Sequence, residues 1–173
     1  TVSGITDADK TYDVNDVATL NTGSVLYSGL INGDTFSGTY TGAFNNKNVG
    51  TGKTVTITPT YSGADVGNYS ITNHPTITAD VAVKALTATA SAANKVYDGT
   101  TTATTTLTFT GLVGSETLGQ TVASTFNNKN VGTGKTVTVN SITLANGTNG
   151  GLAANYSISP GQTTTANVTA KAL

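Results

Sequence analysis

The chain contains no cysteine, methionine or tryptophan, and charged residues make up only 10% of its 173 residues. Without cysteine it forms no disulfide framework, zinc–thiolate cluster or thiol redox centre. The formal net charge is −1, and no cluster of lysines or arginines is present. Binding to nucleic acid needs such a basic patch, and the apolar runs are far shorter than a membrane-spanning helix. We therefore expect no nucleic-acid partner and no membrane insertion.

Groups that perform enzymatic chemistry are equally scarce. His74 is the only histidine, and the second half of the chain has only Asp98 and Glu116 as acids. No catalytic triad can be assembled from this set. His74 precedes Pro75 and is expected in an exposed loop. The chain is therefore predicted to be non-enzymatic and to use no cofactor.

Threonine and glycine are abundant, while most strong helix formers are rare. β-Branched residues suit a pleated, half-exposed surface. Apolar and polar residues alternate with period two in short segments, which predicts strands with one buried face. The clearest such segments are 54–58, 69–71, 106–109, 136–139 and 156–158. Short strands separated by turn signals predict an all-β fold of antiparallel, immunoglobulin-like sandwiches.

An internal duplication organises the chain. The string FNNKNVGTGKTVT occurs at residues 44–56 and again, letter for letter, at 126–138. Weaker matches extend the similarity over the whole chain, and they predict two domains, 1–86 and 87–173. A repeat of this kind is typical of tandem arrays, whose copies contact neighbouring repeats of the same protein.

The junction between the copies contains no flexible spacer. Residues 77–92 include neither glycine nor proline, so we expect an extended connection that makes the tandem an elongated, stiff rod. The tripeptide Lys84-Ala85-Leu86, which leads into the second copy, recurs as Lys171-Ala172-Leu173. We therefore expect a further copy to follow in the parent protein.

Three segments of the second copy resemble the YDG domain, one of the mostly-bacterial immunoglobulin-like repeats. They are KVYDGTTTAT at 95–104, FNNKNVGTGK at 126–135 and Ala-Asn-Tyr at 154–156. The resemblance implies a stalk module of filamentous-haemagglutinin-like secreted adhesins, and thus an extracellular, secreted or cell-surface location. The first copy departs from the pattern, because Val14 stands where the family has the glycine of Tyr-Asp-Gly.

The residues shared by both copies are interpreted as structural. Tyr12 and Tyr97 are expected to bury their rings, and Asp13 and Asp98 to accept hydrogen bonds from the turns that follow. The pairs Asn68-Tyr69 and Asn155-Tyr156 are expected to form corners in which the tyrosine ties down the chain. The alternative is that these residues contact a ligand.

The segment Val49-Gly50-Thr51-Gly52-Lys53-Thr54 is superficially similar to a phosphate-binding loop. That motif requires a glycine six positions before the lysine, where this chain has Lys47, and a helix after it. The following residues alternate as a strand does. We therefore interpret Gly50-Thr51-Gly52 as a tight hairpin.

Two other site hypotheses remain open at this stage. Asp7, Asp9, Asp13 and Asp16 cluster near the first strand, and their oxygens would suit calcium; otherwise they form a solvated acidic edge. A Lys–Asn isopeptide crosslink would join Lys10 to Asn68 and Lys95 to Asn155, with Asp98 or Glu116 as the neighbouring acid.

The function predicted from these patterns is a stalk or spacer repeat of a large bacterial adhesin or exoprotein. One alternative is a self-assembling subunit of a filament, sheath or surface layer, because low charge and strand edges favour homotypic contacts. Another is a glycan- or receptor-binding adhesin module. Its candidate contacts are Tyr27, Tyr40 and Tyr61, which have no counterparts in the second copy.

Overall fold

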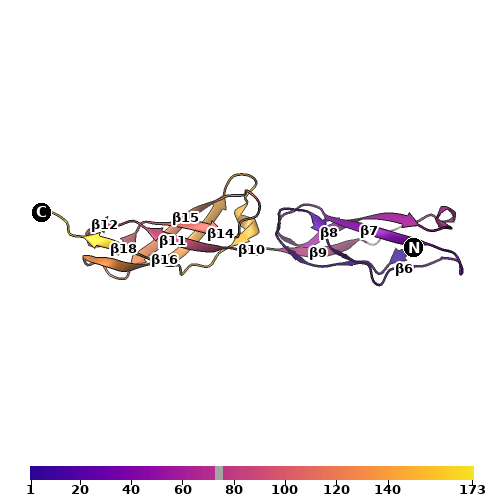
Figure 1. The fold of residues 1–173 in the computed structure, drawn as a ribbon, viewed down its shortest axis with the longest axis horizontal. Helices are drawn as coiled ribbons and strands as arrows, with labels where there is room; N and C mark the ends of the chain where they lie inside the picture. The colour runs from indigo at the N-terminus through magenta and orange to yellow at the C-terminus, as the bar shows by residue number, and fades with distance from the viewer. Residues whose placement is uncertain (73–75) are drawn as a thin grey trace. The chain divides into compact units, whose positions relative to one another are not determined.

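The computed structural model describes residues 1–72 and 76–173 (Figure 1). The chain divides into two compact units, Thr1–Val83 and Lys84–Leu173. The division lies slightly before the position expected from the repeat, because Lys84 and Ala85 pair with a strand of the second unit. His74 lies outside the described residues.

Both units are built from strands. The elements of the first unit are β1 (Val2–Ser3), β2 (Thr6–Asp7), β3 (Lys10–Thr11), β4 (Val17–Ala18), β5 (Leu20–Asn21), β6 (Leu26–Tyr27), β7 (Ser37–Phe44), β8 (Gly50–Ser62), the 3₁₀ turn η1 (Val66–Asn68) and β9 (Ile77–Ala82). Those of the second unit are β10 (Lys84–Ala85), β11 (Thr87–Ala92), β12 (Lys95–Val96), β13 (Thr102–Ala103), β14 (Thr105–Thr110), β15 (Leu118–Phe126), β16 (Gly132–Asn146), the 3₁₀ turn η2 (Ala153–Asn155), β17 (Tyr156–Ser157) and β18 (Thr163–Thr169). The all-β prediction is confirmed, and the described residues include no helix with the length and hydropathy of a transmembrane span.

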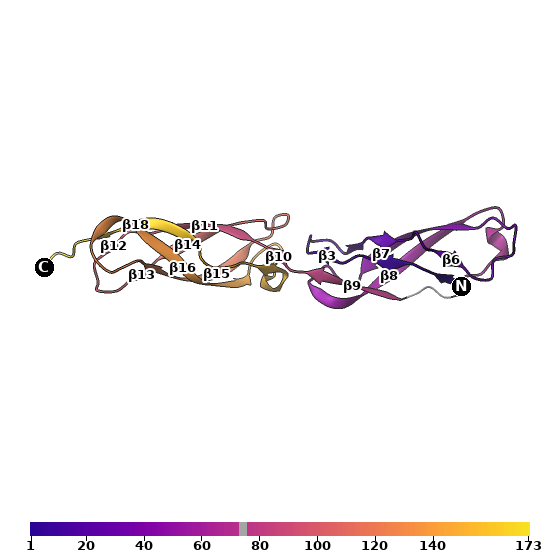
Figure 2. The same ribbon diagram turned by 90° about the horizontal axis from the view of Figure 1, so that it is seen from below.

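Each unit contains the same five-stranded sheet. Its order is β3-β9-β8-β7-β4 in the first unit and β12-β18-β16-β15-β13 in the second. Smaller two-stranded sheets accompany it: β1-β6 and β2-β5 in the first unit, and β11-β14 and β10-β17 in the second (Figures 1 and 2).

The prediction of purely antiparallel sheets is wrong. β3 pairs with β9, β12 with β18, and β10 with β17 in parallel. Parallel neighbours need a long connection between them. In the five-stranded sheets this connection is almost the whole unit, because the short first strand lies at the sheet edge and pairs with the last strand.

Alternation places the core on one face of each five-stranded sheet. Phe44 pairs with Val55, and its counterpart Phe126 pairs with Val137. All four side chains are buried, and each contributes about 1.5–3 kcal/mol to folding. The threonines between the inward-facing residues of β8, such as Thr54 and Thr56, are exposed. The repeated string is therefore mainly a core determinant.

The structure also tests the strand predictions. Residues 54–58, 106–109 and 136–139 lie in strands as predicted, and the chain from 77 to 92 is in strands except at Val83 and Leu86. The prediction fails at 69–71, which belong to no strand, although Tyr156 and Ser157 of the second unit do. The difference arises because the partner strand β10 exists only beside the second unit's pair.

The expected hairpin at Gly50-Thr51-Gly52 is wrong. These residues lie within β8, and the register with β9 shifts between Gly50 and Lys53. β16 has the same irregularity between Gly132 and Lys135. Gly52 and Gly134 have φ values of 57° and 58°, which favour a β-bulge with glycine in the left-handed region.

Candidate functional site

A buried lysine is the centre of the repeated string. Lys53 is 8% exposed, and its Nζ donates to Asn46 O at 2.8 Å, to Asn46 Oδ1 at 2.7 Å and to Asn48 O. The Nζ also lies 6.0 Å from the centre of the Phe44 ring, within the range of a cation–π contact. Burial, with the charge of Lys10 nearby, lowers the pKa of Lys53.

The second unit repeats this lysine cage. Lys135 is also 8% exposed, and its Nζ donates to Asn128 O at 2.6 Å, to Asn128 Oδ1 at 2.7 Å and to Asn130 O, with the Phe126 ring 5.9 Å away. The cage therefore consists of the lysine, the Asn-x-Asn loop and the phenylalanine. Its ammonium is directed at protein oxygens, and the neighbouring glycine Gly134 donates its N–H to Asn167 Oδ1 at 2.8 Å. This geometry supports a structural role for the string.

The Tyr-Asp pairs lie at the start of the five-stranded sheets. Tyr12 is completely buried, and Tyr97 packs against the core of the second unit. Asp98 Oδ1 accepts from Thr100 N at 2.9 Å and lies 2.7 Å from Lys95 Nζ. The Lys95 ammonium and the Thr100 N–H lower the pKa of Asp98 to about 2.

The first copy makes the equivalent turn without glycine. Asp13 Oδ1 accepts from Asn15 N at 3.2 Å and lies 2.8 Å from Lys10 Nζ. Val14 has a φ of 75°, close to the 82° of Gly99. A β-branched residue with positive φ is strained. The turn geometry is thus retained although the residue that favours it has been replaced.

The tyrosines of the Asn-Tyr pairs hold the loops that precede β7 and β15. Tyr69 Oη donates to Asp34 Oδ2 at 2.5 Å and accepts from Ile31 N at 3.0 Å. In the second unit Tyr156 Oη donates to Glu116 Oε2 at 2.7 Å and accepts from Val113 N at 3.1 Å. Sequence reasoning considered Glu116 only as a catalytic acid for the crosslink, because nothing in the sequence pairs it with a tyrosine forty positions away.

The proposed isopeptide pairs are not brought together. Lys95 lies in β12, beside the end of β18, whereas Asn155 lies in η2 at the opposite end of the unit (Figure 1). Lys10 in β3 and Asn68 in η1 are separated in the same way (Figure 2). The lysine Nζ atoms instead bond the loops that follow them, such as Thr100 O at 3.0 Å. The structure therefore gives the crosslink hypothesis no support.

The structure also gives the calcium hypothesis no support. In residues 1–72 and 76–173, no three acidic or histidine side chains gather in a way that would hold a metal ion. Three of the four aspartates instead lie in separate surroundings. Asp9 Oδ1 accepts from Asp80 N at 2.8 Å, Asp13 pairs with Lys10, and Asp7 lies in β2, where burial raises its pKa.

One feature distinguishes the first unit. Tyr27, Tyr40 and Tyr61, predicted as contacts of a binding module, lie together with Phe36 and Tyr69. Phe36 is central, with ring centroids 5.0 Å from Tyr27, 5.2 Å from Tyr61 and 5.6 Å from Tyr69. Tyr40 Oη donates to Tyr27 Oη at 3.0 Å, and burial and this hydroxyl raise the pKa of Tyr40.

The second unit replaces most of this aromatic cluster with aliphatic residues. Strand register aligns Tyr40 with Val122, because they pair with Pro59 and Ile142, and it aligns Tyr61 with Leu144. Sequence comparison missed the last correspondence, because β16 contains an extra residue where its register with β15 shifts, after Ala123.

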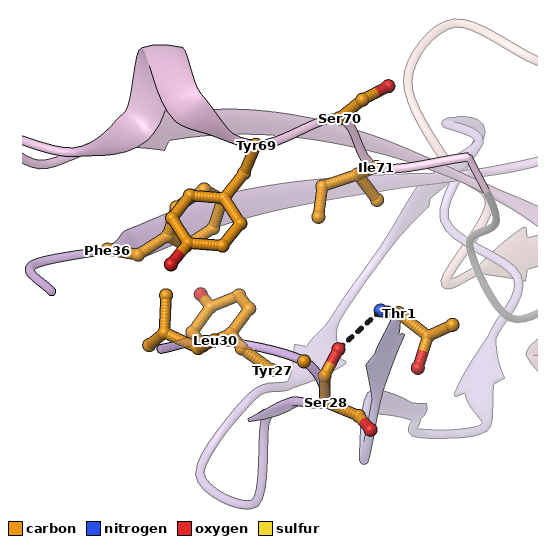
Figure 3. Close-up of a pocket in the computed structure, with 9 residues that line it drawn as sticks. Thr1, Tyr27, Ser28, Leu30, Phe36, Tyr69, Ser70 and Ile71 are labelled. Atoms are coloured by element: carbon orange, nitrogen blue, oxygen red, sulfur yellow. Dashed lines mark hydrogen bonds between the residues drawn. The ribbon is translucent and has the colours of Figure 1, made fainter. Parts of the chain in front are cut away.

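A pocket of about 140 Å³ adjoins the aromatic cluster (Figure 3). The rings of Tyr27, Phe36 and Tyr69 and the side chains of Leu30 and Ile71 face it, and Thr1, Ser28, Gly29 and Ser70 complete its lining. At its rim the Thr1 amino group donates to Ser28 O at 2.8 Å. Such a lining suits one small apolar group with backbone bonds at the edge.

A second hollow, of about 460 Å³, lies in the second unit beside β10 and β17. Its lining includes Ser157, Ser159 and Gln162 but no ionisable side chain. It has no obvious means of recognising a charged ligand. The pocket of the first unit is therefore the stronger candidate site.

The family comparison accounts for the duplication. The model of the YDG domain matches residues 1–79 and again 82–166. Searches of curated proteins and of solved structures returned no match. Since the two matches cover nearly the whole chain, the protein belongs to the YDG domain family and carries two consecutive copies of the domain.

Proposed function

We propose that this chain is a non-enzymatic stalk or spacer segment of a large extracellular bacterial adhesin or exoprotein. The observation that carries the proposal is that both units use their shared residues for the same internal bonds. Lys53 and Lys135 hold the same loops, and Tyr69 and Tyr156 tie the same connections. An array of such repeats is stabilised unit by unit, so bonds repeated in each unit are expected of a spacer that is extended by adding copies.

In this proposal each unit is an immunoglobulin-like sandwich, and the tandem is a stiff rod. Two pairings in the second unit support the sandwich. β12 pairs with β18 at the edge of the five-stranded sheet, and β11 pairs with β14 in a separate ladder that would form the second layer. The strand-rich junction from 77 to 92 supports stiffness, because it contains no glycine or proline at which the chain would bend easily.

Single-molecule force spectroscopy tests the spacer function. Stretching the whole chain should give two unfolding events, each lengthening it by roughly 25 nm: this is the extended length of one unit at about 3.3–3.6 Å per residue, less the length that the folded unit already spans. Small-angle scattering should show an elongated particle at low concentration. Extension of the chain without discrete events, or a freely hinged particle, would contradict the proposal.

A second candidate function is glycan or receptor binding by the first unit, which the aromatic cluster favours. Half-buried tyrosines present in only one copy are not required by the shared fold. The matched variants Tyr40→Val and Tyr61→Leu install the residues of the second unit. A glycan array that gives no signal for the original chain, or the same signal for these variants, would remove this candidate.

A further inference from the structure

Asparagine is followed directly by glycine at three places, 32–33, 146–147 and 149–150. Two of these pairs are held by hydrogen bonds. Asn146 Oδ1 accepts from Ala153 N at 2.9 Å, and the nitrogen of the glycine after it donates to a main-chain oxygen at 3.0 Å. Asn149 Nδ2 donates to Ser115 O at 2.9 Å. In both pairs the asparagine amide is therefore fixed in place.

The third pair, Asn32-Gly33, lies in an exposed turn of the first unit. Asp34 N donates to Ile31 O at 3.1 Å and closes the turn. Within residues 1–72 and 76–173, neither the Asn32 side chain nor the Gly33 N–H makes a hydrogen bond. Gly33 has a φ of 99°, and a Cβ placed on it would meet no other residue within 4 Å. The Asn32 amide and the nitrogen that follows it can thus approach each other.

We propose that Asn32 is a site of spontaneous deamidation. The Gly33 nitrogen, after losing its proton to hydroxide, attacks Cγ of Asn32. The new N–Cγ bond forms as the Cγ–Nδ2 bond breaks, and the amide group leaves as ammonia. Water then opens the cyclic imide at one of its two carbonyl carbons, which gives aspartate or isoaspartate. Glycine favours the first step because it has no side chain and its backbone turns freely.

Isoaspartate would change how the loop is held. In this product the main chain runs through the former side chain, so the segment between residues 31 and 34 becomes longer by one carbon. Tyr69 Oη binds both ends of that segment: it accepts from Ile31 N at 3.0 Å and donates to Asp34 Oδ2 at 2.5 Å. The longer segment should break at least one of these bonds. Because the Tyr69 ring lies 5.6 Å from that of Phe36 (Figure 3), the loosening would reach the aromatic cluster.

The second unit has the same loop without the reactive pair. Tyr156 Oη accepts from Val113 N at 3.1 Å and donates to Glu116 Oε2 at 2.7 Å. The two residues between these partners are Gly114 and Ser115, and neither carries an amide side chain. Deamidation in this loop is therefore confined to the first copy, and it would loosen one unit with time while the other keeps its bonds.

Peptide mass spectrometry of the whole chain, aged at mildly alkaline pH, tests the reaction. Trypsin cleaves after lysine, which places Asn32 in peptide 11–47 and the other two pairs in peptide 136–171. Deamidation adds about 1 Da, and fragmentation locates it and distinguishes isoaspartate from aspartate. Asn32 should react roughly tenfold faster than either other asparagine, because those must first break a hydrogen bond.

The Asn32→Gln chain is the control for the reaction. It keeps the amide, but ring closure needs a larger ring, so the fast reaction in peptide 11–47 should disappear. Equal rates at the three Asn-Gly pairs, or a fast reaction that persists in the Asn32→Gln chain, would overturn the assignment of the site.

Hydrogen exchange tests the link to Tyr69. In the purified isoaspartate form, the Ile31 amide should exchange roughly tenfold faster than in the fresh chain, because its bond to the tyrosine is lost. Asn32→Asp adds the charge without the extra carbon and should leave this rate unchanged. In the Tyr69→Phe chain the amide should exchange fast from the start and change little on ageing.

Unchanged Ile31 exchange in the isoaspartate form, or the same acceleration in the Asn32→Asp chain, would overturn the structural consequence. None of these results bears on the spacer function, which the force measurement on the fresh chain tests separately.

Discussion

Replacement of Gly99 by valine tests the interpretation of the repeated Tyr-Asp turn. Gly99 has a φ of 82°, and a Cβ there would meet nothing within 4 Å. The cost of the substitution is therefore conformational and not a steric clash with neighbouring residues. An L-residue with left-handed geometry costs about 1–2 kcal/mol, and a β-branched residue lies at the upper end of that range.

Part of that cost is offset in the unfolded chain. Replacing glycine reduces the freedom of the unfolded state, which stabilises the fold by about 0.4–1 kcal/mol. The net destabilisation expected for Gly99→Val is thus about 1 kcal/mol. For a domain of this size, 1 kcal/mol lowers Tm by roughly 4–8 °C.

Differential scanning calorimetry of the whole chain measures this change, and hydrogen exchange resolved by peptide assigns it to the second unit. Gly99→Asn is the control, because asparagine tolerates the left-handed region and should cost less than valine. The reciprocal change Val14→Gly relieves strain but removes a half-buried side chain, so its effect should stay within about 1 kcal/mol. An unchanged Tm for Gly99→Val, or an equal loss for asparagine, would refute the reasoning.

Three further predictions concern the internal bonds. Lys53→Met and Lys135→Met keep the length of the side chain but remove its three donated hydrogen bonds. Each should lower the free energy of unfolding, measured in urea, by about 1–3 kcal/mol. An effect in only one unit would contradict the equivalence of the cages. The pKa of Asp98 is lowered from 3.8 to about 2, so its ion pair stabilises the fold fully above pH 4 and is lost as the pH falls toward 2. Asp98→Asn should therefore flatten the Tm–pH curve between these values. An unchanged slope would show that other carboxyl groups dominate. Tyr156→Phe removes a hydrogen bond to Glu116, which is 5% exposed, so it should lower the free energy of unfolding by about 1.5–3 kcal/mol. Tyr69→Phe should cost less, because its partner Asp34 is less buried. Equal losses in chemical denaturation would show that burial of the acid is unimportant.

Several features follow from the sequence alone because they are local. Alternation in 54–58 and 136–139 predicts strands, since only one periodicity matches a half-buried pleated surface. The letter-for-letter string predicts two equivalent units. The family resemblance was likewise visible in residues 95–104 and 126–135.

Other features depend on contacts between distant residues, and only the tertiary structure decided them. The parallel pairing of β12 with β18 joins residues more than seventy positions apart. Two segments of identical sequence, 69–71 and 156–158, differ in conformation because Lys84-Ala85-Leu86 lies beside only one of them. Alternation defines which face of a strand is buried, but the strand that pairs with its edge is chosen by what the folded chain brings next to it.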